Sequence, residues 1–129
     1  MITTANKTNS EIINEVFTAL VTQGKRCMNV EGSCAYGNEV EGVHCAVGHL
    51  LPDDCEYLMK YDGGVSSLLG EFANVGPNDA WLREHSDLIR YTQWAHDAEC
   101  QARRLEYIDD ICIQFDIKKS QTMTDWTNI

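Results

Sequence analysis

The sequence has little that would tie it to a membrane, to nucleic acid or to a disulfide scaffold. No apolar run approaches the roughly 18 residues that a membrane span requires. The 129 residues include only two prolines and ten basic side chains, against twenty acidic ones. The resulting net charge of -10 repels the phosphate groups of nucleic acids and of anionic lipids. We therefore expect a protein that binds neither nucleic acid directly nor a membrane.

The first ten residues, from Met1 to Ser10, are polar and lack the apolar stretch of a secretory signal, which predicts a cytoplasmic protein. In a reducing compartment, six cysteines are expected to be core residues, metal ligands or reactive thiols instead of disulfides. A chain of this length buries enough surface for one core, which predicts a single domain over residues 1–129. Composition leaves the oligomeric state open.

Apolar residues at helical spacing predict a mainly α fold of five or six helices, several of them short, around one core. Asn9 or Ser10 is expected to cap the first helix, Asp53 or Asp54 a later short one, and Ser86 the long helix that follows. The predicted helices cover residues 10–24, 43–51, about 53–60, 65–72, about 86–97 and 105–115.

The segments between and beyond these helices are expected to be irregular. Residues 1–8 and 117–129 lack periodicity and should be loosely ordered. Glycines and short polar residues between 25 and 42 predict a loop. A small β-ribbon within residues 27–45, with extended pieces near Ala35 and Val40, is the expected exception to the helical fold.

The stretch from Cys27 to Tyr57 carries most of the residue types that build binding sites. It holds four of the six cysteines, two of the four histidines and four of the nine glycines. If the protein has a site, we expect the site to touch this stretch. Its polar residues allow three kinds of site.

The first is a structural zinc site formed by Cys27, Cys34, Cys45 and His49, with His44 beside them. In a helix over residues 43–51, Cys45 and His49 would share one face, and two loop thiolates would complete a tetrahedral set. The chain has no Cys-x-x-Cys pair, however, which strong zinc signatures contain. We therefore expect buried free cysteines and no cofactor, with zinc as the alternative.

The second is a reactive thiol at Cys45, with His96 and Asp97 supplied by the long helix. Helix N-terminal amides and an imidazole lower the pKa of a thiol, and a carboxylate orients the imidazole, as nucleophilic cysteine chemistry requires. The small neighbours Ala46 and Gly48 equally fit tight packing around an unreactive Cys45.

The third is a ligand-binding cleft formed by Tyr36, Asp53, His96 and Asp97. The same residues can have structural roles instead. Asp53, which follows Pro52, can cap a helix, while His96 and Asp97 at a helix end can satisfy buried amides and carbonyls.

Short motifs in this stretch and in the long helix form a recognisable set: Cys34-Ala-Tyr36, Gly42, Cys45-Ala-Val-Gly48, Leu51-Pro52-Asp53, Tyr57 and His96-Asp97. Together they resemble a family of small tailed-bacteriophage proteins that has no assigned activity, over residues 10–116. A bacterial family of unknown function is more distantly similar. The resemblance implies a phage protein in the cytoplasm of an infected bacterium, and it implies no mechanism.

Small size, acidic charge and this resemblance lead to one expected function. We expect a non-enzymatic interaction protein that binds a host protein, with host-defence or regulatory factors as the target class. The alternative is a small enzyme or ligand-binding protein that uses a pocket of Cys45, His96 and Asp97. Trp94 is a candidate for the inner face of the long helix, whereas an exposed tryptophan in acidic surroundings would suit a protein interface.

Overall fold

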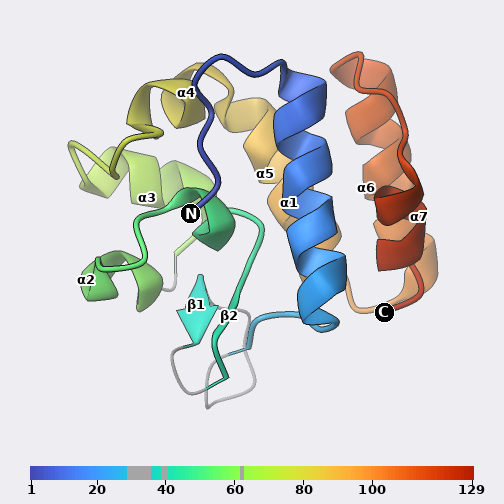
Figure 1. Ribbon diagram of the computed structural model, residues 1–129, viewed down its shortest axis with the longest axis horizontal. Coiled ribbons are helices and arrows are strands. Elements are labelled where there is room, and N and C mark those ends of the chain that lie inside the picture. Colours follow the sequence, from blue (N-terminus) through green and yellow to red (C-terminus); the bar gives the residue numbers. More distant parts are fainter. Residues whose placement is uncertain (29–35, 39–40, 62) are drawn as a thin grey trace.

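The computed structural model describes residues 1–28, 36–38, 41–61 and 63–129. These residues form seven α-helices, one short 3-10 helix and one two-stranded sheet (Figure 1). The mainly α prediction and the small β-ribbon are confirmed. The α-helices are α1 (Asn9–Gln23), α2 (Glu56–Met59), α3 (Val65–Glu71), α4 (Asp79–Glu84), α5 (Ser86–Asp97), α6 (Gln101–Gln114) and α7 (Gln121–Trp126).

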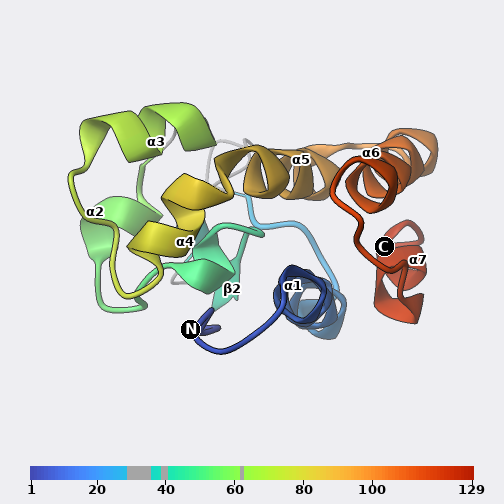
Figure 2. The same ribbon diagram turned by 90° about the horizontal axis from the view of Figure 1, so that it is seen from above.

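The longer helices lie in two rows. Seen from above, α3, α5 and α6 line one side of the molecule, while α1 and α7 lie on the other (Figure 2). α5 packs against α6, and α1 packs against α7. Since Tyr91 of α5 contacts Phe115 just after α6, and Trp94 contacts Tyr107, the α5 and α6 pair runs antiparallel.

The first helix follows the sequence pattern closely. It buries one apolar stripe and ends at Gly24, which adopts the left-handed conformation (φ 77°) that glycine tolerates best. The predicted caps Asn9 and Ser10 are wrong by one or two positions, because Thr8 accepts from the backbone N–H of Glu11 and the Glu11 side chain accepts from that of Thr8. The buried stripe is Ile12, Ile13, Val16, Phe17 and Leu20.

The predicted helix over residues 43–51 is wrong. Its first part is strand β2 (Val43–His44), which pairs antiparallel with β1 (Gly37–Asn38), and only the 3-10 helix η1 (Gly48–Leu50) is helical. The Gln23 side chain explains the extended geometry. It accepts from the backbone N–H of His44 (3.1 Å) and donates to the carbonyl of His44 (2.7 Å), as a neighbouring strand would. Ala35 and Val40 lie outside the described residues.

Two other predicted caps are also wrong. Asp53 and Asp54 precede α2 without capping it, since the helix begins at Glu56 after Cys55 and has no side-chain cap. Ser86 is the first residue of α5, and no side chain caps that helix either.

Both termini are packed, although we expected them to be loosely ordered. The backbone N–H of Ile2 donates to the carbonyl of His49 (2.8 Å), and the buried amide of Asn78 donates to the carbonyl of Ile2 (2.7 Å). At the other end, Met123 and Trp126 of α7 are fully buried. In the part of the chain that the structure describes, no helix is both long and apolar enough to cross a membrane.

Candidate functional site

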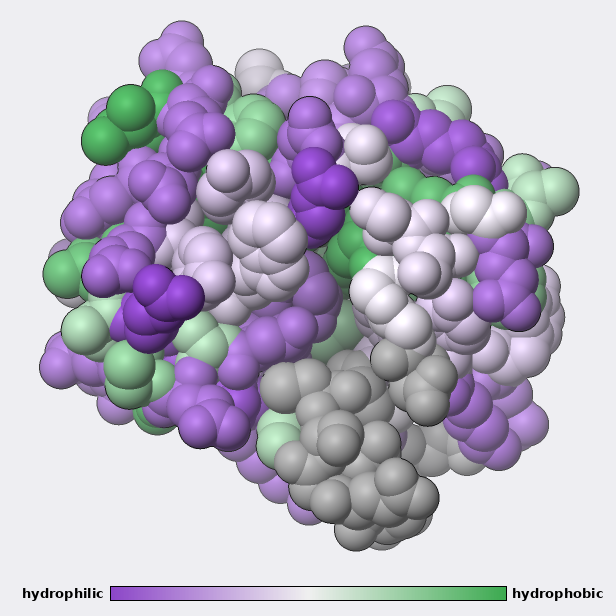
Figure 3. All heavy atoms as spheres, turned by 180° about the vertical axis from the view of Figure 1, so that it is seen from behind, coloured by the Kyte–Doolittle hydropathy of each residue, from purple (hydrophilic) through white to green (hydrophobic). Residues whose placement is uncertain are grey.

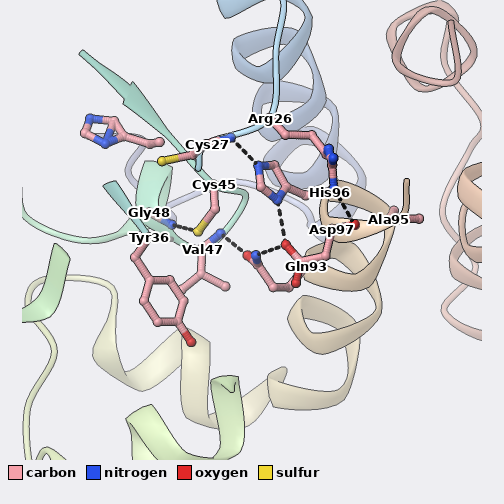
Figure 4. Close-up of polar contacts among 12 residues, drawn as sticks. Arg26, Cys27, Tyr36, Cys45, Val47, Gly48, Gln93, Ala95, His96 and Asp97 are labelled. Atoms are coloured by element: carbon pink, nitrogen blue, oxygen red, sulfur yellow. Dashed lines mark hydrogen bonds and ion pairs between the residues drawn. The ribbon is translucent and has the colours of Figure 1, made fainter. Parts of the chain in front are cut away.

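Buried hydrogen bonds tie α5 to the backbone on either side of the ribbon (Figure 4). His96 Nε2 accepts from the N–H of Cys27 (3.0 Å), and His96 Nδ1 lies 2.7 Å from Asp97 Oδ1. Gln93 Nε2 donates to the same Asp97 oxygen (2.8 Å), while Gln93 Oε1 accepts from the N–H of Val47 (3.1 Å). We call these three side chains and the two backbone amides the latch.

The latch fixes the tautomer of His96. A backbone N–H can only donate, so Nε2 of His96 carries no proton, and the ring proton lies on Nδ1, from which it is donated to Asp97. The ring has no exposed surface and stacks on Trp126, with 5.8 Å between ring centroids. Because both ring nitrogens are engaged and the ring is fully buried, the Nε2 lone pair of His96 is not free to act as a general base.

Cys45 is not set up as a nucleophile. Its side chain is fully buried, and its Sγ accepts from the N–H of Gly48 at 3.2 Å. Burial raises the pKa of the Cys45 thiol well above its ordinary value, so the neutral thiol persists at physiological pH. The N–H of Gly48 belongs to the first residue of η1 and acts to lower the pKa of the thiol, but burial outweighs this contact. The geometry therefore gives that hypothesis no support.

The predicted zinc ligands are engaged elsewhere where the structure describes them. Cys27 Sγ lies 3.5 Å from the carbonyl of Val43, and His49 Nε2 lies 3.1 Å from Gln23 Oε1. Across residues 1–28, 36–38, 41–61 and 63–129, no group of three or more His, Cys, Asp or Glu side chains could hold a metal ion. Cys34 lies outside these residues, so a zinc set that includes Cys34 stays a prediction.

The four residues of the predicted polar cleft do not come together, because most of them bind different partners. The Tyr36 hydroxyl donates to the carbonyl of Gly63 (2.7 Å), and burial raises the pKa of this phenol above its usual range. Asp53 is exposed and lies 3.4 Å from the Met1 amino group and 3.6 Å from His44 Nε2. Only His96 and Asp97 are joined to each other by a hydrogen bond in the described parts of the chain.

Aromatic rings cover the outer face of the α5 and α6 pair. The Trp94 ring lies 5.1 Å from that of Tyr91 and 5.8 Å from that of Tyr107, measured between centroids, and Trp94 is 41% exposed. We call these three residues the aromatic surface. The guanidinium groups of Arg90 and Arg103 lie over the rings of Trp94 and Tyr107, at 5.8 and 5.5 Å. On this side of the molecule, weakly hydrophilic, pale side chains gather among strongly hydrophilic ones (Figure 3).

An open pocket of about 460 Å³ adjoins the aromatic surface where α5 turns into α6. Asp97 belongs both to this pocket and to the latch, and among the residues that the structure describes it is the only predicted site residue that lines this pocket. The lining residues are Trp94, Asp97, Ala98, Glu99, Cys100, Arg103 and Tyr107.

Sequence reasoning missed Gln93 of the latch and Tyr91 and Tyr107 of the aromatic surface. It also offered Trp94 for the inner face of α5, which is wrong. The helical period of the sequence could have identified the outer residues. When the buried stripe of α5 faces the core, residues 87, 90, 91 and 94 lie on the opposite side of the helix. That stripe is Leu88, Ile89, Thr92, Gln93, Ala95 and His96.

The chain matches no protein-family model, no curated protein and no solved structure.

Proposed function

We propose that this protein is a small, phage-encoded interaction protein that binds a host protein, with a component of a host-defence system as the target class. The resemblance to small tailed-phage proteins supports the context. The aromatic surface supports binding to a protein, and the high net charge of -10 supports electrostatic selection of that partner.

The observation that carries the proposal is the exposure of Trp94. The Trp94 ring is 41% exposed, lies beside the rings of Tyr91 and Tyr107 and has the Arg90 guanidinium over it. An exposed group of large side chains of this kind is typical of an interaction site. Tryptophan, tyrosine and arginine are also the residues that most often dominate the binding energy of protein interfaces.

The alternative, a small enzyme, has weaker support. Its proposed nucleophile, Cys45, is a buried neutral thiol, and the Nε2 lone pair of its proposed base, His96, is held by the N–H of Cys27. A general base needs that lone pair free. Cys45 and His96 therefore have structural roles in place of catalytic ones.

Affinity capture from a lysate of the host bacterium tests the proposal. We expect a tagged copy of the chain to recover a partner in stoichiometric amount, and the Trp94→Ala variant to lose it, since the ring supplies the centre of the contact. Repeated recovery of no stoichiometric partner would contradict the proposal.

The matched control is Tyr57→Ala. Tyr57 lies on α2 and is a 58% exposed aromatic residue outside the aromatic surface. Its removal should leave the captured partner unchanged. Equal loss of the partner in both variants would show adhesion through any exposed ring, which also contradicts the proposal.

A further inference from the structure

We infer that the latch is a proton-sensitive switch that opens at one of its two ends. When His96 gains a second proton, its Nε2 can no longer accept the N–H of Cys27, whereas Gln93 continues to hold the N–H of Val47. The inference follows from the chemistry of the two acceptors and from the charges around the His96 ring. It does not depend on the proposed function.

The two backbone amides that the latch holds form a matched pair. Cys27 and Val47 are both fully buried, and their N–H groups donate to side chains of α5 at 3.0 and 3.1 Å. The acceptor for Cys27 is an imidazole nitrogen, which belongs to the side-chain type that gains its proton in the physiological pH range. The acceptor for Val47 is an amide oxygen, which does not titrate. Acid therefore acts on one end of the latch and not on the other.

A second proton on His96 and the bond to Cys27 exclude each other. In the closed latch, the single ring proton lies on Nδ1, and Nε2 offers its lone pair to the N–H of Cys27. A proton from the solvent would occupy that lone pair, so that two N–H groups would face each other across 3.0 Å. The backbone at Cys27 must then move away from the ring, and the proton stabilises the open form.

The other side of the ring favours the charged form. Nδ1 lies 2.7 Å from Asp97 Oδ1, and an imidazolium donates a stronger hydrogen bond to a carboxylate than a neutral imidazole does. Asp97 keeps this donor and the Gln93 amide in both states. Figure 4 shows Asp97 and the backbone of Cys27 on different sides of the His96 ring. The charge that His96 gains is thus compensated within α5, and the contact to the backbone outside the helix is lost.

Charged groups on two other parts of the fold also act on the ring. Arg26, which follows α1, donates to the carbonyl of Asp97 at 2.9 Å. Arg104 of α6 lies over the Trp126 ring, on which His96 stacks. Both guanidinium groups oppose a second proton on His96, while the Asp97 carboxylate, which is hydrogen-bonded to the ring, favours it. Charge alone therefore fixes neither state of the ring.

Two further titratable groups beside the latch are uncharged between pH 7.5 and 5.5, the interval that the test uses. Burial lowers the pKa of His49 on η1 to about 4, so this ring stays neutral there. Burial raises the pKa of the Cys45 thiol, which also stays neutral. A change in the latch over this interval is therefore attributable to His96.

Amide hydrogen exchange in the full chain, followed by NMR between pH 7.5 and 5.5, tests the inference. The intrinsic exchange rate changes with pH alike for both amides, so the ratio of the rates at Cys27 and Val47 isolates the latch. We expect this ratio to rise about fivefold or more as the pH falls, because an imidazole released from the latch takes up a proton across this interval. A constant ratio would overturn the inference.

The ring itself gives a second readout, which needs no substitution. The nitrogen NMR signal of His96 Nε2 should change from that of a bare nitrogen to that of a protonated one as the exchange ratio rises, while Nδ1 stays protonated. If Nε2 remained unprotonated down to the pH at which the protein unfolds, the latch would not respond to acid, and the inference would be wrong.

Two substitutions assign the effect to one ring. His96→Gln supplies an amide oxygen that can accept from the N–H of Cys27 without titrating, so the exchange ratio should no longer depend on pH. His49→Gln is the matched control, because it removes a neighbouring imidazole that is not part of the latch, and it should retain the pH dependence of the parent. A pH dependence that persists in His96→Gln, or that disappears in His49→Gln, contradicts the inference.

Discussion

Trp94 and His96 lie two positions apart on α5 and belong to opposite kinds of environment. His96 has no exposed surface, and each of its ring nitrogens has a partner. Trp94 lies on the outside, where its ring contacts those of Tyr91 and Tyr107 and the guanidinium of Arg90. The residue whose type suggested chemistry thus supports the fold, and the residue offered as a candidate for the inner face of α5 lies on the outside.

The difference arises from how each region satisfies its polar groups. Loop backbone cannot be buried without hydrogen-bond partners, and the latch supplies two of them, for the N–H groups of Cys27 and Val47. Regular helices satisfy their own backbone, so the outer sides of α5 and α6 leave their side chains free for other contacts. In α5, the polar side chains of Gln93 and His96 therefore serve the buried loop, while Tyr91 and Trp94 lie on the outer side of the helix.

The largest effect is expected from filling the space at Gly48, next to the latch. A Cβ atom there would lie 1.9 Å from the carbonyl oxygen of Tyr36, and that carbonyl also accepts from the N–H of Cys45. Because the obstructing atom belongs to the backbone, we expect Gly48→Ala to lower the free energy of unfolding by about 3 kcal/mol. Chemical denaturation measures the change.

Gly70→Ala is the control for that variant. Gly70 lies inside α3, and a Cβ atom there would meet nothing within 4 Å. Alanine should stabilise this helix by about 0.5–1 kcal/mol, because it restricts the unfolded chain and favours helix. If Gly48→Ala were as stable as the parent, the ribbon and η1 could not be packed as closely as described.

The sequence was sufficient where structure is local and insufficient where contacts are distant. The stripe of α1 and the stop at Gly24 follow from helical period and glycine geometry alone. The strand at Val43–His44 does not, because the Gln23 side chain, about twenty residues earlier, holds that backbone extended. Local pattern could not anticipate that partner.

The same distinction applies to the candidate site. His96 and Asp97 were chosen by residue type, and their structural role, as helix-end groups that satisfy loop amides, was one of the two explanations offered. Which explanation applies depends on the N–H of Cys27, which lies 69 positions away in sequence. For Trp94, the positions of the buried residues of α5 indicate an outward side chain, but the large apolar ring favoured an inward placement.

His96→Phe, which removes one of the hydrogen bonds of the latch, should lower the free energy of unfolding by less than Gly48→Ala does. His96→Phe keeps a ring that can stack on Trp126 but leaves the buried N–H of Cys27 without its acceptor. An unsatisfied buried amide costs roughly 1–3 kcal/mol, so we expect a loss of about 2 kcal/mol in the free energy of unfolding. Amide hydrogen exchange at Cys27 should accelerate as well. A variant with the stability and the exchange rate of the parent would show that the latch does not hold the loop.

Acidic pH should lower the folding stability, because it protonates His49, which lies beside the latch. Burial is the main cause that lowers the pKa of His49 from 6.5 to about 4, and the positive charge of the N-terminus adds to it, while Asp53 acts in the opposite direction. Between these values the unfolded chain binds a proton that the folded chain does not. Stability is therefore complete above about pH 6.5 and falls as the pH decreases toward about 4.

The decrease attributable to His49 should be on the order of 1–3 kcal/mol across that interval. His49→Gln removes the titrating ring and retains a donor for Gln23 Oε1, which already accepts from the N–H of His44. Denaturant unfolding at several pH values should show a flatter dependence for the variant than for the parent. Burial also lowers the pKa of His44, so a part of the slope should remain. Identical slopes in parent and variant would mean that His49 is not kept neutral by the fold.

The smallest effect on stability should come from Trp94→Ala. The ring is 41% exposed, no hydrogen bond holds it among the described residues, and its contacts with Tyr91 and Tyr107 lie on the surface. Alanine is also a better helix former than tryptophan, which offsets part of the lost contact area. We expect the free energy of unfolding to change by less than about 1 kcal/mol, as is usual for surface substitutions. Measured beside His96→Phe, this variant separates the two sides of one helix. If Trp94→Ala unfolded the protein as readily as His96→Phe, the ring would be part of the core, and its exposure could no longer support a role in binding.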